Sequence, residues 1–287
     1  MKNKIQVENV SFVYSPGTTY RTEALDNVSI GFEEGKITGL IGHTGSGKST
    51  LVQMLNGLMK PAEGRVLLNG EDIWKNPKEI SRVRFQVGLV MQYPEYQLFE
   101  ETVRKDIAYG PGNMGMSDDD IAERVMSAAE TVGLDSASLD KSPFDLSGGQ
   151  KRRAAIAGVM AMEPEVLILD EPAAGLDPEG RNSIFSAISD YRKKKNATII
   201  IVSHSMEDMA QWCDNIVVMS NARVFMSGTK DEVFARSAEL SSVGLDIPEI
   251  TRLMMLLKER GFNVDVGAYT VESAIKSVKK LFCEKKQ

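Results

Sequence analysis

Residues 42–50 (GHTGSGKST) fit the phosphate-binding pattern G-x-x-x-x-G-K-[ST]. Glycines let a backbone wrap so that its N–H groups converge on phosphate oxygens, and the N-terminus of a following helix adds partial positive charge. In such a loop Lys48 would neutralise the β- and γ-phosphates of a nucleotide, and the Ser49 hydroxyl would ligate Mg²⁺. The predicted binding residues are Gly42, His43, Thr44, Gly45, Ser46, Gly47, Lys48, Ser49 and Thr50.

A pair of carboxylates ends a strongly apolar run, residues 166–172 (VLILDEP). The carboxyl ends of parallel strands are where ligands sit in α/β proteins. Asp170 is therefore predicted to hold the magnesium ion, directly or through water, and Glu171 to polarise an attacking water. A solvated turn would explain the two charges, but not their position at the end of so apolar a strand.

A third segment, residues 146–150 (LSGGQ), precedes a run that is helical in pattern through Arg153, Ile156 and Met160. A serine and two glycines at a helix start make a second anion-binding terminus. Taken alone, the segment also fits an ordinary helix cap.

These segments must be positioned by an α/β core. Residues 37–41 (ITGLI) form a continuous apolar strand directly before the phosphate loop, as do residues 166–169 and 198–202 further along the chain. Repeated β-loop-α units indicate a mostly parallel sheet flanked by helices, and alternation over residues 5–10 and 28–32 indicates two half-buried N-terminal strands. The helix after the phosphate loop is expected to carry an apolar stripe of Leu51, Met54, Leu55 and Leu58.

The chain divides into a core over residues 1–230 and a helical extension over residues 231–287. Within the core, residues from about 93 to 160 are mainly helical and form a candidate inserted subdomain, in which Ser117 and Asp120 are spaced as a helix cap. The tail of the extension is basic and is expected to be a solvated tail rather than a lipid contact; its lysines are Lys276, Lys279, Lys280, Lys285 and Lys286.

Composition excludes several classes of function. A net charge of −6 gives no overall attraction to nucleic acid, and two distant cysteines, Cys213 and Cys283, fit free thiols in a reducing compartment. Residues 1–10 lack the apolar run of a secretory signal, and no apolar stretch approaches the ~20 residues that span a bilayer. We therefore expect a soluble chain whose membrane role depends on a partner.

Together, the phosphate loop, LDEP and LSGGQ resemble the ATP-binding-cassette (ABC) family over at least residues 5–228. The resemblance implies ATP hydrolysis, and a fold in which N-terminal antiparallel strands and a helical subdomain accompany a mostly parallel sheet. It also implies that ATP is clamped between the phosphate loop of one subunit and the LSGGQ helix of another. Ser147, Gly148, Gly149 and Gln150 would then serve a partner's nucleotide.

The same resemblance gives roles to further residues. Tyr14 matches the aromatic residue that stacks on adenine, and Gln92 the glutamine that touches Mg²⁺ and the attacking water. Asp177, in Gly-Leu-Asp, matches the loop at the dimer interface, and His204 the histidine that contacts the γ-phosphate. The implied catalytic residues are Glu171, His204, Gln92 and Lys48, and the implied magnesium ligands are Ser49, Gln92 and Asp170. Ala173 stands where the family often carries a hydroxyl residue, with little expected effect.

A narrower likeness covers residues 92–111 (QYPEYQLFEETVRKDIAYGP) and 149–158 (GQKRRAAIAG). These segments resemble the ATPases of energy-coupling factor (ECF) transporters, more closely the second of their two paralogues. The resemblance implies a paralogous ATPase in a heterodimer (or a second copy in a homodimer), a transmembrane coupling protein docking near Gln92–Val103, and an indirectly contacted substrate-binding membrane protein. The implied function is to drive uptake of vitamins or transition-metal ions by ATP hydrolysis, with this chain bound peripherally at the cytoplasmic face of the membrane. Glu95, Glu100 and Glu101, beside apolar Leu98 and Phe99, are expected to accept arginines of the coupling protein.

An importer for metal ions or amino acids that uses an external binding protein is the main alternative. A chromosome or DNA-repair ATPase is disfavoured, because only 99 positions separate Lys48 from Ser147 and no sustained heptads lie between them. Translation-associated ABC proteins usually carry two cassettes in one chain and basic surfaces, whereas this chain carries one cassette and is acidic.

Overall fold

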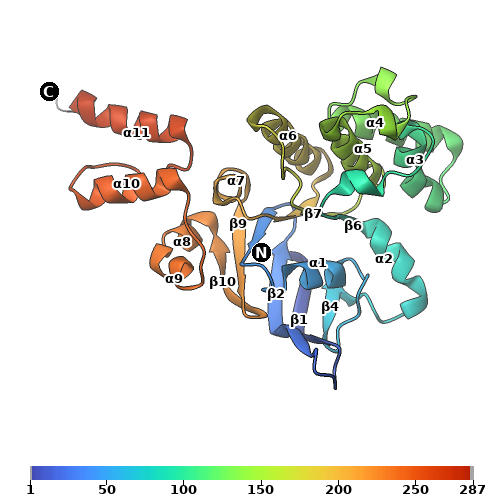
Figure 1. The fold of residues 1–287 in the computed structure, drawn as a ribbon, viewed down its shortest axis with the longest axis horizontal. Coiled ribbons are helices and arrows are strands. Elements are labelled where there is room, and N and C mark those ends of the chain that lie inside the picture. Colours follow the sequence, from blue (N-terminus) through green and yellow to red (C-terminus); the bar gives the residue numbers. More distant parts are fainter. Residues whose placement is uncertain (1, 285–287) are drawn as a thin grey trace.

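The computed structural model describes residues 2–284, and the predictions for Lys285 and Lys286 lie outside these residues. Two sheets form the centre of the molecule, a helical subdomain lies at one end of its long axis, and the C-terminal helices lie at the other (Figure 1). The predicted fold class is confirmed.

The first sheet is antiparallel, in the order β2-β1-β4-β5, and the second has the order β10-β9-β3-β8-β7-β6. In the second sheet, all pairings are parallel except that of β10 with β9. The strands are β1 (Asn3–Tyr14), β2 (Thr22–Glu33), β3 (Ile37–Ile41), β4 (Glu63–Leu68), β5 (Glu71–Asp72), β6 (Val87–Val90), β7 (Val166–Asp170), β8 (Thr198–Val202), β9 (Asn215–Ser220) and β10 (Arg223–Thr229).

Helices surround these sheets and make up both ends of the molecule (Figure 1). The α-helices are α1 (Lys48–Leu55), α2 (Ile80–Gln86), α3 (Val103–Asn113), α4 (Asp118–Thr131), α5 (Gly148–Met160), α6 (Pro178–Lys195), α7 (Met206–Trp212), α8 (Lys230–Phe234), α9 (Ser237–Ser242), α10 (Glu249–Glu259) and α11 (Val271–Glu284). Short 3₁₀ helices are η1 (Pro77–Glu79), η2 (Pro94–Gln97), η3 (Ser136–Ser138) and η4 (Pro143–Asp145).

The central strands β3 and β8 are buried at every position, as their continuous apolar sequences predict. Because β3, β7 and β8 are parallel neighbours, their carboxyl ends lie at one edge of the sheet. The loops after these three strands carry the phosphate loop, Asp170 with Glu171, and His204. Topology thus brings together residues that are far apart in the sequence.

The apolar stripe predicted for α1 is correct for Leu51, Met54 and Leu55, which are all fully buried. It is wrong for Leu58, whose surface is 46% exposed. The helix ends before this residue, because Gly57 adopts a left-handed backbone with φ of +72° and turns the chain out of the stripe.

The C-terminal helices divide between two cores. Phe234, Leu240 and Ile247 pack into the main core, whereas α10 and α11 enclose a separate cluster that includes Met254 and Ala274. Within residues 2–284, no helix combines the length and the apolar character needed to cross a bilayer.

Candidate nucleotide site

The phosphate loop joins β3 to α1, and glycines are sterically required at two of its positions. Gly42 and Gly47 have φ values of +154° and +103°. A Cβ on Gly42 would lie 2.3 Å from the carbonyl oxygen of Met219, and one on Gly47 would lie 2.3 Å from that of Ala24. Only glycine fits these positions, so the backbone is shaped into a loop whose amides can surround an anion.

Lys48 begins α1 and folds back over the loop. Its Nζ donates to the carbonyl oxygens of Gly42 at 2.6 Å and His43 at 3.0 Å. Burial lowers the pKa of Lys48, and the attraction of Asp170 and Glu171 opposes that shift. The ammonium group is therefore held inside the loop, beside the two carboxylates at the end of β7.

The carboxylates after β7 have different environments. Burial and the neighbouring Glu171 raise the pKa of Asp170, while Lys48 and His204 oppose the rise. Glu171 has a left-handed backbone with φ of +51°, held by its N–H donating to Val202 O at 2.9 Å. A non-glycine residue in this conformation is strained by about 1–3 kcal/mol, and such strain clusters at functional sites.

The side chain of Glu171 is fixed from the loop after β8. Its Oε1 accepts from the backbone N–H of His204 at 2.8 Å, and its Oε2 accepts from Ser203 Oγ at 3.3 Å. The His204 ring lies nearby, with Nε2 3.8 Å from Glu171 Oε1, and its side chain is 57% exposed. One carboxylate is thus oriented by two neighbours while the imidazole stays free to meet a ligand.

A cavity of about 430 Å³ lies over this edge of the sheet, within the range of small-molecule sites. Eleven of the predicted residues line it, namely Tyr14, Thr44, Gly45, Gly47, Lys48, Ser49, Thr50, Gln92, Asp170, Glu171 and His204. Gly42 and Ser46 are buried in the phosphate loop below, and His43 bonds within the loop, its Nδ1 lying 2.8 Å from Thr44 O.

Sequence reasoning missed four lining residues, Thr22, Glu23, Ala24 and Val202. The first three begin β2, and the antiparallel register pairs Thr22 with Tyr14 across the turn at residues 15–21. Recognising residues 14 and 22 as hairpin partners would have found them.

Three oxygen donors line the same cavity: the Ser49 hydroxyl, the Gln92 amide and the Asp170 carboxylate. Such hard oxygen ligands fit Mg²⁺, which normally takes a few protein oxygens and completes its shell with phosphate and water. Tyr14, at the rim, has its hydroxyl 3.3 Å from Thr50 Oγ1.

The remaining predicted residues lie at helix starts outside this cavity's lining. Ser147 caps α5, with Oγ accepting from Gln150 N–H at 3.3 Å and its own N–H donating to Gln150 Oε1 at 3.0 Å. Asp177 caps α6 by accepting from Gly180 N–H at 2.7 Å. Both are helix caps within the chain, and Gly148 and Gly149 open the first turn of α5.

The predicted grouping of Glu95 with Glu100 and Glu101 is wrong. Glu95 turns inward and forms a bidentate pair with Arg152 of α5, with Nη2 to Oε1 at 2.8 Å and Nε to Oε2 at 3.1 Å. Burial works against the charge, but the hydrogen bonds and attraction of Arg152 leave the pKa of Glu95 lowered. This carboxylate is already neutralised inside the chain.

The pattern of the ABC transporter family matches residues 25–174. The energy-coupling factor transporter ATP-binding protein EcfA2 of Clostridium acetobutylicum is 52% identical over 275 residues, which are 96% of each chain. Among solved structures, cbiO1 of Clostridium perfringens, part of the ABC transporter complex cbiONQ, is 40% identical with a TM-score of 0.75, and the match covers 89% of this chain and 100% of that one. The dimeric bacterial ABC cassette MJ0796 is 25% identical with a TM-score of 0.71, over 79% and 98% of the two chains.

These similarities confirm the predicted family, the predicted cassette fold and the predicted hydrolysis of ATP. The motifs, the topology that gathers them and the matched relatives agree: the chain belongs to the ABC transporter family, as an ATP-hydrolysing subunit of the energy-coupling factor type.

Proposed function

We propose that this chain is one half of an ATP-driven clamp that sits on the cytoplasmic face of the membrane and moves a transmembrane coupling protein. Its other half is a paralogous ATPase subunit. Each nucleotide is held by the phosphate loop of one subunit and by the Ser147–Gly149 turn of the other. MJ0796, a cassette of similar fold, is itself dimeric.

The glycine at position 148 carries this proposal. Beyond the adjacent residues and the backbone of its own helix turn, no atom of the described chain lies within 4 Å of the place where a Cβ on Gly148 would stand, and the φ of Gly148 is outside the left-handed region. Glycine is about 1 kcal/mol worse than alanine in a helix, so neither space nor backbone geometry inside the chain accounts for it. A phosphate group approaching from another molecule would account for it, because only a bare backbone allows that approach.

Catalysis in the clamp combines positioning with electrostatic stabilisation. Lys48, already aimed into the loop, stabilises the charge of the β- and γ-phosphates. Glu171, oriented by the His204 amide and Ser203, polarises the attacking water, and the exposed His204 ring contacts the γ-phosphate. Mg²⁺ held by Ser49, Asp170 and Gln92 would neutralise part of the phosphate charge when bound.

Docking on the coupling protein uses a surface patch that follows Gln92, which we name the docking patch: Tyr96, Leu98, Phe99, Glu100 and Glu101. Leu98 and Glu100 are partly buried in it, and the other three are exposed. Tyr96 is 84% exposed and Phe99 59% exposed, the latter packed edge-on against Tyr109 at 5.0 Å. Exposed aromatic side chains next to acidic ones suit a partner helix that offers apolar residues and arginines. Glu101 pairs with Lys105 at 2.6 Å in an exposed ion pair, which is weak enough for a partner arginine to displace.

The double substitution Glu100→Lys with Glu101→Lys tests this docking. It should weaken capture of the coupling protein in a pull-down by at least about tenfold, because like charges would then face each other. ATP binding should not change, since neither residue lines the nucleotide cavity. Glu123→Lys with Glu130→Lys, on the exposed face of α4, makes the same charge change and should leave capture intact. Equal capture by both double variants would refute docking at the patch.

Affinity purification from native membranes separates this function from the alternative importer. The proposal expects a coupling protein, a paralogous ATPase and small substrate-binding membrane proteins to co-purify. An external binding protein in their place would support the alternative.

A further inference from the structure

The guanidinium of Arg152 connects three segments: helix α5, which begins at the LSGGQ turn, the segment that leads to the docking patch, and the loop before Asp177. It lies on α5, about 7.5 Å along the helix from Ser147, and it is only 5% exposed. Two of its nitrogens bind Glu95 in the segment that follows Gln92. Its remaining terminal nitrogen, Nη1, donates to the carbonyl oxygen of Ala174, in the loop that leads to Asp177.

We propose that Arg152 is a positioning residue that carries movement of the LSGGQ turn to the docking patch. The inference rests on the proposed function, since it requires that a partner's nucleotide binds at Ser147–Gly149. When that nucleotide pulls on the start of α5, the bidentate pair obliges Glu95 to follow. Glu95 lies in η2, one residue before Tyr96 of the docking patch.

The geometry of the pair suits the transmission of force. A bidentate arginine–carboxylate contact fixes angle as well as distance, and a buried contact of this kind is little screened by salt. A lysine offers one point charge on a flexible stem and cannot hold Glu95 in a fork while also reaching Ala174. Arg152→Lys therefore keeps the charge but loses the rigid connection.

Two backbone amides of the docking patch can be used to detect such a movement. The backbone N–H groups of Phe99 and Glu100 donate to Asp106 Oδ1 and Oδ2 at 3.1 and 3.2 Å. Asp106 lies on α3, so displacement of η2 relative to α3 would lengthen these bonds and change the exchange rate of the two amides with solvent.

The experiment is hydrogen exchange on the transporter complex purified from membranes, with and without ATP, in a Glu171→Gln background that slows hydrolysis. In the parent, ATP should slow exchange at residues 147–152 and change it at residues 93–103. With Arg152→Lys, the change at 93–103 should fall below half of the parental change, while the slowing at 147–152 persists. Glu95→Gln should behave likewise, and combining the two should add nothing further, because both break one connection.

Arg104→Lys is the matched control, since Arg104 also bonds a carboxylate in the helical subdomain, with Nε 2.9 Å from Asp140 Oδ1, but at the surface. It should keep both changes. If Arg152→Lys gives no stable protein, Glu95→Gln alone tests the inference. Glutamine fills the same space and keeps one acceptor oxygen, so the fold should persist, but it cannot form the bidentate pair with Arg152. A full change at 93–103 in Glu95→Gln or Arg152→Lys would overturn the inference. A parent without ATP-dependent slowing at 147–152, or without ATP-dependent change at 93–103, would overturn it too; the former result would also count against the clamp itself.

Discussion

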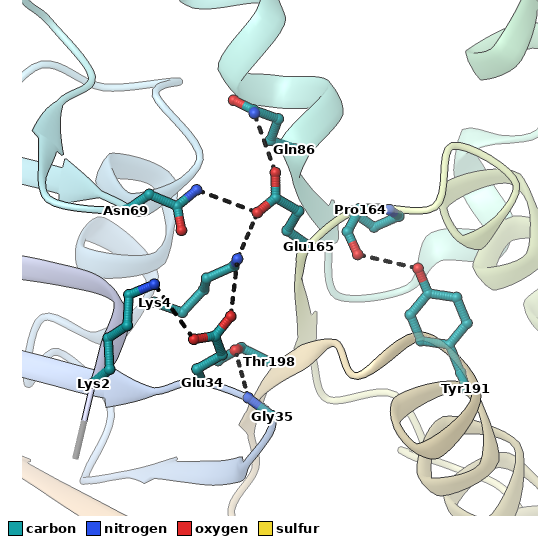
Figure 2. Close-up of polar contacts among 10 residues, drawn as sticks. All are labelled: Lys2, Lys4, Glu34, Gly35, Asn69, Gln86, Pro164, Glu165, Tyr191 and Thr198. Atoms are coloured by element: carbon teal, nitrogen blue, oxygen red, sulfur yellow. Dashed lines mark hydrogen bonds and ion pairs between the residues drawn. The ribbon is translucent and has the colours of Figure 1, made fainter.

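The two edges of the parallel sheet use polar residues in opposite ways. Near the amino ends of β7 and β8, polar groups bond to one another, in one connected group around Glu165 and in separate hydrogen bonds at Thr198 and Tyr191 (Figure 2). At the carboxyl ends of the same strands, the nucleotide cavity opens over Lys48, Asp170, Glu171 and His204. One edge is built to hold the fold together, and the other is built to receive a ligand.

Glu165 is the centre of the amino-edge network. Its carboxylate pairs with Lys4 of β1 at 2.6 Å and accepts from Asn69 and Gln86, each at 3.2 Å. These partners come from the first sheet, the turn after β4 and the end of α2, so one side chain ties both sheets to a helix (Figure 2).

Glu171, only six residues later, contrasts with Glu165. Its carboxylate accepts hydrogen bonds from Ser203 and His204, in the loop after β8. Its backbone is strained, and its side chain lines the nucleotide cavity. The contrast teaches that stability and chemistry are separated on opposite edges of the sheet. Substitutions at the two glutamates should therefore have opposite consequences.

Glu171→Gln should produce the largest effect. Losing the carboxylate that polarises water should lower ATP turnover by about 10²–10⁴-fold, while ATP binding and the melting temperature stay close to wild type. Steady-state hydrolysis by the assembled complex measures the turnover, and titration with a fluorescent ATP analogue measures the binding of ATP. Glu165→Gln serves as the control at the opposite edge and should hydrolyse ATP normally. A Glu171→Gln complex that kept most of its turnover would remove the assignment.

Glu165→Ala should show the reverse pattern at a smaller scale. It leaves half-buried Lys4 with one fewer partner and removes two further hydrogen bonds, so the free energy of unfolding should fall by about 1–3 kcal/mol. Chemical denaturation measures the loss, and ATP affinity should be unchanged. Reduced ATP affinity without a loss of stability would contradict the separation of the two edges.

The pH dependence of that stability gives a finer and smaller test. Burial opposes the ionisation of Glu165, but its hydrogen bonds with Lys4, Asn69 and Gln86 and the charge of Lys4 leave its pKa lowered. A lowered pKa means that the stabilisation is fully present above the ordinary value of 4.5 and disappears as the pH falls through the lower folded value. The difference in unfolding free energy between wild type and Glu165→Gln should therefore shrink on acidification. If this difference grew as the pH fell, the pKa of Glu165 would not be lowered in the folded protein.

Many of the predicted site residues lie together in the structure because they belong to contiguous motifs. The phosphate loop, Asp170 with Glu171, and the loop holding His204 each follow a strand whose apolar run is visible in one dimension. Parallel topology then brings them to one edge, which is why most predicted residues line one cavity.

What the sequence did not reveal depends on contacts between distant segments. The Glu95–Arg152 pair spans 57 positions and the Glu165–Asn69 bond spans 96, and neither leaves a periodic signal. The strands β4, β5, β6, β9 and β10 were not predicted individually, because short strands depend on their sheet neighbours more than on their own pattern.

The central claim is that two helix ends from different molecules hold one ATP, and Gly148→Val tests it most directly. A Cβ at this position would meet no atom within 4 Å in the described chain beyond its neighbours and its own helix backbone, so we expect the fold and ATP binding to the variant's own phosphate loop to be unchanged. In the assembled complex, however, it would block the partner's nucleotide, and turnover at that site should fall by about 10² or more. Full turnover by a complex carrying Gly148→Val would show that ATP is not held between the two subunits.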